Sequence, residues 1–406
     1  MAEGQRYLDD ADFRRRSLVT ALQNPDNGYA RLRLSAYGLR DRGWELLPIW
    51  NPRAKIVTAG ESAAAPLPGT VAPLWNGEEP QSLQDWIALG REVFFRYPLR
   101  AEAALASAID TPERAAAFGL ARTADGVYPG VLRFQDVDGV TRIGIACALC
   151  HSDVRDGSLI VGAARRDFDL GGLLLWHAQR TGGAMSSSLA ARLRRWGPGR
   201  ADITLDKEED PVAIPDLWGL RDQTALTQGA TLRHIGPVAL ALRQETQLIE
   251  TNGQRTRPPR ELAWALAMFV YSLQPPPRPA IAASDAAAVA HGEAIFASEC
   301  RRCHGSAVGS GPPVAADTVG TDGALARGAA RGTGYYRPPA LIDLAHRAPY
   351  LHDGTIATLA DLLSSDRLRP DYRGGVRGPG PVNGHAYGLD LSAPDRGALA
   401  RYLLSR

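Results

Sequence analysis

Two five-residue motifs hold the residues best suited to chemistry. They are Cys147-Ala148-Leu149-Cys150-His151 and Cys300-Arg301-Arg302-Cys303-His304, and both follow the pattern C-x-x-C-H. The spacing places two thiols on one side of a helical turn, directly before an imidazole, and this is the attachment pattern of haem c. The cysteines then form thioethers with the porphyrin, and the histidine becomes the proximal iron ligand. The sequence therefore predicts two covalently attached haem c groups, with His151 and His304 bound to iron.

Two other kinds of site also use C-x-x-C pairs. The four cysteines of the chain all belong to the two motifs, so both pairs together would suffice for a four-cysteine zinc site. Each pair alone would suffice for a redox-active dithiol. Neither alternative explains a histidine directly after each second cysteine, so haem attachment is favoured.

The residue opposite each proximal histidine decides function, because an iron with two strong protein ligands transfers electrons whereas an open face binds peroxide or dioxygen. After the second motif the chain offers His346, His352 and His385, and no methionine. His352 lies in a turn-rich segment that can aim one side chain inward, so we expect it to be the distal ligand. Its alternative role is a hydrogen bond to a propionate or to backbone. We expect His346 and His385 at the surface or among the groups that surround the haem.

For the first motif the candidates for the distal position are His177, Met185 and His234, or an iron left open to water or a weak ligand. If the site is open, His234 or Glu245 would take a proton from bound peroxide, and Arg233 would stabilise the charge that develops. A solvated helix face is the alternative interpretation of these three residues.

The elements that position the two motifs share a second pattern. Gly-x-x-x-Phe occurs at Gly90 in a predicted helix over 83–96 and at Gly292 in a predicted helix over 286–299. A glycine allows two helix backbones to approach closely, and the aromatic residue fills the contact. The expected partners are the helices that close each unit, over 260–273 and 395–404. The repeat indicates two cytochrome c-like units in tandem.

We therefore predict a mainly α protein of two tandem cytochrome c-like domains with long loops and an N-terminal extension. Within that extension we expect a polar helix at 8–24 and an extended arm at 48–80, which is rich in Pro, Gly and Ala. The predicted boundaries are 1–80 for the extension, 81–274 for the first domain, 275–283 for a proline-rich linker and 284–406 for the second domain.

The composition argues against some classes of partner. The net charge of +2 gives no electrostatic case for nucleic acid, and no apolar run is long enough to span a membrane. The first 30 residues are charged and polar, unlike a signal peptide. Because haem c is normally attached outside the cytoplasm, we expect a periplasmic or otherwise exported protein whose signal has been removed.

Three stretches resemble the C-terminal domain of the bacterial di-haem cytochrome c peroxidase family, which includes the MauG maturases. They are the helix and motif from Gly292 to His304, the run Arg337-Pro338-Pro339-Ala340-Leu341, and the run from Arg347 to Thr355 with its Pro-Tyr-Leu-His turn. The same turn is similar to one in the di-haem rubber oxygenases. The resemblance covers about 85–406 and is strong over 285–406. It is loose over 85–275, where 89–95 and 214–217 match weakly.

The resemblance implies two helical domains with haems that face each other across an interface. Haem one on His151 would be the reactive site for peroxide or dioxygen, and haem two on His304 and His352 would transfer electrons to or from a small redox protein. A pure electron carrier, or a haem subunit of a larger redox complex, is the alternative. The family's inter-haem tryptophan is replaced near 226–231, and Trp176 and Trp218 do not match it in position. Substrate, electron donor, oligomeric state and any structural calcium are not determined.

Overall fold

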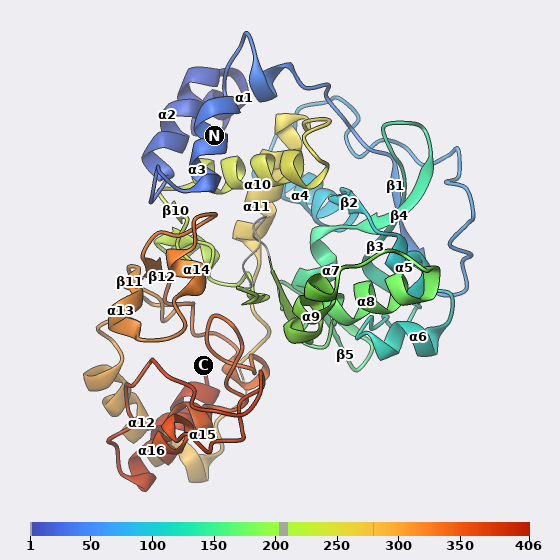
Figure 1. Ribbon diagram of the computed structural model, residues 1–406. Coiled ribbons are helices and arrows are strands. Elements are labelled where there is room, and N and C mark those ends of the chain that lie inside the picture. Colours follow the sequence, from blue (N-terminus) through green and yellow to red (C-terminus); the bar gives the residue numbers. More distant parts are fainter. Residues whose placement is uncertain (1, 203–209, 279) are drawn as a thin grey trace.

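The computed structural model describes residues 2–202, 210–278 and 280–406. In Figure 1 the chain from α12 onward gathers on one side of the elements of the first half. Of the described residues, 41% lie in helices and 12% in strands, which agrees with the mainly α prediction. No helix in the described ranges has the length and apolar character needed to cross a membrane.

Three short helices precede the first predicted unit and pack on α10 (Pro237–Thr251) (Figure 1). They are α1 (Ala2–Asp9), α2 (Ala11–Ala21) and α3 (Gly28–Ala36). The single helix expected at 8–24 is thus divided at Asp10. The reason is local: the Asp10 carboxylate accepts a hydrogen bond from the Phe13 N–H and caps α2, so a new helix begins there.

A four-stranded antiparallel sheet fills much of the region before the first motif, in the order β1-β3-β4-β2. Its strands are β1 (Ala54–Thr58), β2 (Arg100–Ala101), β3 (Val127–Gln135) and β4 (Thr141–Ile145). Part of the expected 48–80 arm is therefore a strand, because β1 pairs with β3 across about seventy residues of chain. Gly130 of β3 lies so close to the first motif that a Cβ would come within 1.9 Å of the Leu149 nitrogen. The sheet therefore supports the first motif directly.

The two predicted helix crossings are both present. Helix α4 (Leu83–Arg96) packs on α11 (Arg260–Ser272), and α12 (Ala286–Glu299) packs on α16 (Ala393–Leu404). At each crossing a glycine lies against a backbone carbonyl of the partner helix. A Cβ added to Gly90 would lie 1.9 Å from the Ala265 oxygen, and one added to Gly292 would lie 2.1 Å from the Ala398 oxygen.

Aromatic rings fill both contacts, as the repeated pattern predicts. The Phe94 and Phe269 ring centroids are 5.2 Å apart, and those of Phe296 and Tyr402 are 5.3 Å apart. Each crossing therefore combines a close backbone approach with an aromatic pair, and the same local design occurs twice in one chain.

Replacing Gly90 or Gly292 with alanine is expected to destabilise the fold by at least the roughly 1–3 kcal/mol that overpacking costs, because a backbone carbonyl cannot rotate away. Urea unfolding followed by circular dichroism measures the effect. Gly397→Ala is the matched control. Its Cβ would meet only the end of the Arg401 side chain at 3.5 Å, so alanine there should stabilise α16 by about 0.5–1 kcal/mol. Equal stability of all three variants would contradict this account of the crossings.

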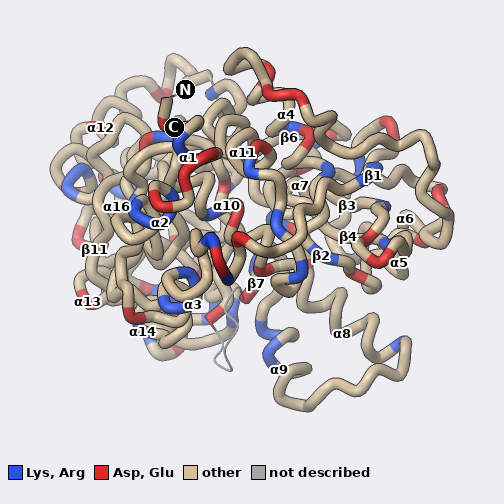
Figure 2. The backbone as a smooth tube through the Cα atoms, turned by 90° about the horizontal axis from the view of Figure 1, so that it is seen from above, with Lys and Arg blue, Asp and Glu red and all other residues tan. Residues whose placement is uncertain are grey.

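The remaining elements of the first half are short, apart from α10, α8 (Leu170–Thr181) and α9 (Ser187–Trp196). In Figure 2 α8 and α9 extend away from the other elements as a helical pair. The others are η1 (Gly43–Leu46), α5 (Ala103–Ala108), α6 (Pro112–Ala117), α7 (Cys147–His151), β5 (Ser152–Arg155), β6 (Ser158–Val161), β7 (Arg200–Ala201), β8 (Val212–Ala213), η2 (Leu220–Asp222), β9 (Ala225–Leu226) and β10 (Leu232–Arg233).

The second half is loop-rich between α12 and α16, with a small apolar core around Phe296, Leu399 and Leu403. Its other elements are η3 (Ala283–Asp285), β11 (Val314–Ala315), α13 (Ala316–Val319), α14 (Ala324–Arg327), β12 (Tyr335–Tyr336), η4 (Leu344–His346), α15 (Leu359–Leu362) and η5 (Ser365–Leu368). Prolines 275–277 before it line a groove together with Asp343 and Arg406.

Candidate functional site

Both C-x-x-C-H motifs present their histidine in the same way. The first forms the one-turn helix α7, and the second follows the end of α12. The His151 Nδ1 lies 3.0 Å from the Pro215 carbonyl oxygen, and the His304 Nδ1 lies 2.7 Å from that of Gly309. A carbonyl only accepts hydrogen bonds, so Nδ1 carries the proton in each ring. The Nε2 lone pairs are left for a metal, as in proximal haem ligands.

Burial sets the protonation states around the motifs. It lowers the pKa of His151 to about 4 and also lowers that of His304, so both imidazoles are neutral at pH 7. Burial raises the pKa of Cys147 to about 12 and that of Cys150 and Cys300 to about 11. Redox-active dithiols need a lowered thiol pKa, so these surroundings do not suit that alternative.

The zinc alternative fails on geometry. No group of three or more His, Cys, Asp or Glu side chains in the described ranges could hold a metal ion. The two C-x-x-C pairs therefore do not meet in a shared four-cysteine site. The sequence allowed that arrangement, and only the fold excludes it.

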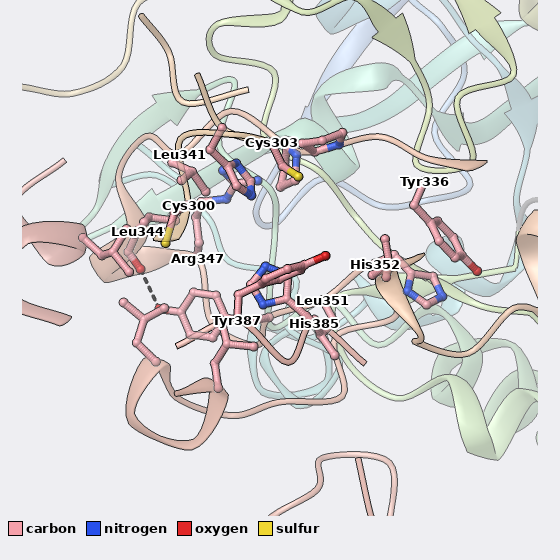
Figure 3. Close-up of a pocket in the computed structure, with 18 of the residues that line it drawn as sticks. Cys300, Cys303, Tyr336, Leu341, Leu344, Arg347, Leu351, His352, His385 and Tyr387 are labelled. Atoms are coloured by element: carbon pink, nitrogen blue, oxygen red, sulfur yellow. Dashed lines mark hydrogen bonds between the residues drawn. The ribbon is translucent and has the colours of Figure 1, made fainter. Parts of the chain in front are cut away.

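A cavity lies against the second motif (Figure 3). Cys300, Cys303 and His304 line it, together with several leucine side chains, among them Leu341, Leu344, Leu359, Leu399 and Leu403. Two thiols, a neutral imidazole and an apolar chamber fit a covalently bound porphyrin, whose faces are apolar and whose iron takes nitrogen ligands.

His385 lies across this cavity from His304. Their ring centroids are 6.5 Å apart. A metal ion held by two opposite imidazoles, each at about 2 Å, separates the ring centroids by about 6 Å. The His385 Nδ1 is buried without a partner, and burial, with the neighbouring His304, lowers the pKa of His385 to about 4. A neutral imidazole with an unpartnered ring nitrogen suits an axial ligand.

The backbone that carries His385 is held firmly in an unusual conformation. His385 has φ +47°, in the left-handed region that non-glycine residues seldom adopt. The fully buried Arg367 donates hydrogen bonds to the carbonyls of Val382 (2.5 Å), Gly384 (2.8 Å) and His385 (3.0 Å). Three bonds from one guanidinium fix the turn, so the ring of His385 is positioned before any ligand binds.

His352, the expected distal ligand, lies elsewhere in the same cavity. Its ring packs on Tyr336 with a centroid distance of 4.3 Å. Figure 3 shows this pair at the end of the cavity away from Cys300, with His385 between them in this view. The His352 carbonyl accepts a hydrogen bond from the Ala213 N–H, which anchors the turn to the first half. The arrangement therefore favours His385 over His352, while His346 is half-exposed and paired with Asp343.

The three residues expected to act on peroxide do not converge. Glu245 is fully buried and accepts hydrogen bonds from the Tyr7 and Tyr37 hydroxyls, both at 2.7 Å, with Arg260 at 3.1 Å. Arg233 is exposed and bonds to Gln23. His234 has both ring nitrogens engaged, by the Gln223 carbonyl and the Tyr271 hydroxyl. The carboxylate holds the N-terminal helices, and neither Arg233 nor His234 faces His151 in these contacts.

A charged group beside the first motif comes instead from another face of α10. The Arg243 guanidinium counters the burial that raises the pKa of Cys147, and it adds to the burial that lowers the pKa of His151. Residues two apart on a helix point in nearly opposite directions. Glu245 therefore lies against Tyr7 and Tyr37, while Arg243 lies between Tyr29 of α3 and Cys147 of the motif. The alternation of polar faces along α10 was the signal in the sequence.

The other distal candidates of the first motif lie on the extended α8–α9 pair. His177 is on α8 and its Nδ1 bonds to the Ser107 hydroxyl at 3.2 Å. Met185 lies in the connection between α8 and α9. Within the described ranges, no histidine ring faces the ring of His151 as His385 faces that of His304.

Residues 212–219, called the bridging segment below, connect the two motifs. The Pro215 carbonyl accepts the His151 hydrogen bond, and the next side chain, Asp216, pairs with Arg166 of the first half at 3.0 Å and Arg347 of the second at 2.8 Å. Burial alone would raise the pKa of Asp216, but the two arginines outweigh it, and the pKa is lowered. Asp216 is therefore an ionised link between the halves.

Comparisons with known proteins bear on the second motif. Residues 287–337, which include Cys300 to His304, match the family described as cytochrome C oxidase, cbb3-type, subunit III. A search of curated proteins found no match. Among solved structures, the chain is similar to the crystal structure of a MauG-like protein associated with microbial copper homeostasis. The identity is 19%, the TM-score is 0.35, and the match covers 55% of this chain and 82% of that one. The 287–337 region is thus of cytochrome c type, which implies covalent haem c.

Proposed function

We propose that this chain is a c-type cytochrome with two covalent haems, one on each C-x-x-C-H motif, in two tandem cytochrome c-like domains. In this proposal the haem on His304 is six-coordinate and transfers electrons. The observation that carries the proposal is the pair His304 and His385, with ring centroids 6.5 Å apart across an apolar cavity. The match of 287–337 to a cytochrome family supports haem binding at that position.

The residues around the second site suit fast electron transfer. Haem supplies a one-electron change at iron, and an iron with two strong nitrogen ligands undergoes that change with little rearrangement. Gly309 orients His304, and Arg367 fixes the turn of His385, so neither ligand moves with the charge. Leucine side chains of the cavity would provide an apolar surface for a bound porphyrin.

For the haem on His151 we propose the reactive role, with a small oxidant such as peroxide or dioxygen as its substrate and a small redox protein as electron partner. The support is the contrast between the two motifs: within the described ranges no histidine ring faces that of His151 as His385 faces that of His304. Arg243 also acts on Cys147 and His151, and its charge could stabilise an anion there. The alternative is a pure electron carrier, in which both irons hold two protein ligands. Cyanide or carbon monoxide binding by half of the haem favours the reactive role, and no binding favours the carrier. A periplasmic location is proposed with either role.

Mass spectrometry of the intact protein tests the number of haems. The wild-type mass should exceed that of the polypeptide by two haems. The double variants Cys147→Ala/Cys150→Ala and Cys300→Ala/Cys303→Ala should each lose one. A wild-type mass equal to the polypeptide, with or without zinc, would overturn the proposal. If one double variant loses both haems, its circular dichroism shows whether the variant has also failed to fold.

A further inference from the structure

Arg337 has an exceptional environment for a charged side chain. It follows β12 in the run Arg337-Pro338-Pro339, and its backbone N–H bonds to the Gln228 carbonyl at 3.0 Å, which fixes it between the two halves. The residue is only 6% exposed. A guanidinium cannot lose its proton to escape the cost of burial, so a buried arginine requires acceptors.

The Arg337 side chain has no such acceptor. Within the described ranges it forms no hydrogen bond or ion pair, and its Nε is buried without a partner. Burial lowers the pKa of Arg337 to about 9, and its charged neighbours Arg347 and Arg243, which are also cations, add to this effect. Other buried arginines are paired. Arg33 has Glu250 at 2.5 Å, and Arg367 has backbone carbonyls. Arg337 is therefore a cation with unfilled donors.

Its position says where the missing anion must lie. Arg337 lines the same cavity as Cys303 and His304, and Pro339, two residues on, reaches the His304 ring with its backbone. A planar guanidinium offers parallel N–H donors that match the two oxygens of a carboxylate. A carboxylate inside this cavity would satisfy the donors and neutralise the charge.

We propose that Arg337 is a buried carboxylate-binding site, and that a propionate of the haem on Cys300 and Cys303 fills it. This inference rests on the proposed function of the second motif and assigns Arg337 a role in setting the potential of that haem. A free small carboxylate shares the same chemistry, and the experiment below separates the two sources. Without the cation, a buried propionate would favour the oxidised iron, because its negative charge would be uncompensated.

The test is a redox titration of the haem-loaded protein, followed by the absorption of the second haem. Arg337→Gln should shift the equilibrium toward oxidised iron at least tenfold, which is about 59 mV for one electron. Arg337→Lys keeps the charge and should stay within threefold of wild type. The matched control is Arg401→Gln, which removes an exposed arginine of α16 and should also stay within threefold, because solvent screens that charge.

If Arg337→Gln still carries two haems and its potential is unchanged, the inference about Arg337 is overturned. The proposed function is not, because the same sample shows that both haems are present. If Arg337→Gln fails to accumulate while Arg337→Lys carries both haems, the charge is required, which supports the inference. If neither Arg337→Gln nor Arg337→Lys accumulates, the shape of the arginine side chain is required rather than its charge, and the inference is overturned. If the wild-type potential falls when acetate is added to carboxylate-free buffer, the site binds a free carboxylate and the propionate assignment is overturned.

Discussion

Replacing His385 with alanine is expected to convert the proposed haem on His304 from low-spin to high-spin, and so to remove the low-spin signal that this haem contributes. The reason is geometric: His385 is the imidazole whose ring centroid lies 6.5 Å from that of His304, and its Nδ1 has no protein partner. Loss of a strong axial ligand leaves a weak-field position, which water fills. Electron paramagnetic resonance and absorption spectra of the oxidised protein measure the change, and added imidazole should restore the low-spin form.

The matched control is His352→Ala. This histidine lines the same cavity but packs on Tyr336, so the low-spin signal should remain. The opposite pattern, with the signal lost in His352→Ala and kept in His385→Ala, would restore the assignment expected from the sequence. The two variants remove the same side chain from the same cavity, so a general disturbance of the fold cannot produce a difference between them.

Replacing Glu245 with alanine is expected to lower the free energy of unfolding by about 3–5 kcal/mol, the cost of breaking a buried ion pair on one side. Glu245 is fully buried, and the variant leaves Arg260 and the hydroxyls of Tyr7 and Tyr37 without their shared acceptor. The N-terminal helices should detach first, because this carboxylate joins them to α10. Urea unfolding by circular dichroism, with proteolysis near residue 40, measures both effects.

Glu92→Gln is the control for Glu245. Glu92 pairs with Arg96 on the exposed face of α4 at 2.7 Å, with side chains 41% and 28% exposed. Such pairs contribute about 0–1 kcal/mol, so this variant should unfold nearly as wild type does. A change below 1 kcal/mol in Glu245→Ala would show that the buried network does not hold the N-terminal helices in place.

The sequence predicted the helices better than any other feature, because their signals are local. The helices predicted at 83–96 and 286–299 are confirmed as α4 and α12, and the glycine contacts of both are confirmed at Gly90 and Gly292. A Gly-x-x-x-Phe pattern needs no knowledge of the rest of the chain. Its partner helices were identified from their own periodicity and their place at the ends of the units.

Features that depend on contacts between distant parts of the chain could not be predicted from the sequence. Strand β1 pairs with β3 from about seventy residues away, and a proline-rich composition around it suggested an irregular arm. Glu245 and Arg243 are two residues apart, and only the packing of α10 decides which of them faces the first motif. A one-dimensional pattern contains neither the strand partner nor the rotation of a helix about its axis.

His385 shows a different limit. It lies in the glycine-rich run Asn383-Gly384-His385 with no apolar periodicity, so it resembled a surface loop. The contacts that make it a ligand candidate come from Arg367, which is fully buried and bonds to three carbonyls of that loop. A loop rich in glycine and asparagine tolerates the left-handed backbone that His385 adopts, and that composition was the available clue.

In the proposed di-haem protein, the bridging segment has a consequence for how the two irons would behave together. Its Pro215 carbonyl sets the hydrogen bond of His151, and Asp216 beside it is held by Arg347 of the second half. A hydrogen bond to a ligating imidazole raises its basicity. A displacement of the second half, such as the docking of the proposed redox partner, is therefore expected to change the strength of the ligand in the first. By linkage the effect is mutual, so the two haems are expected to titrate as a cooperative pair rather than as independent centres.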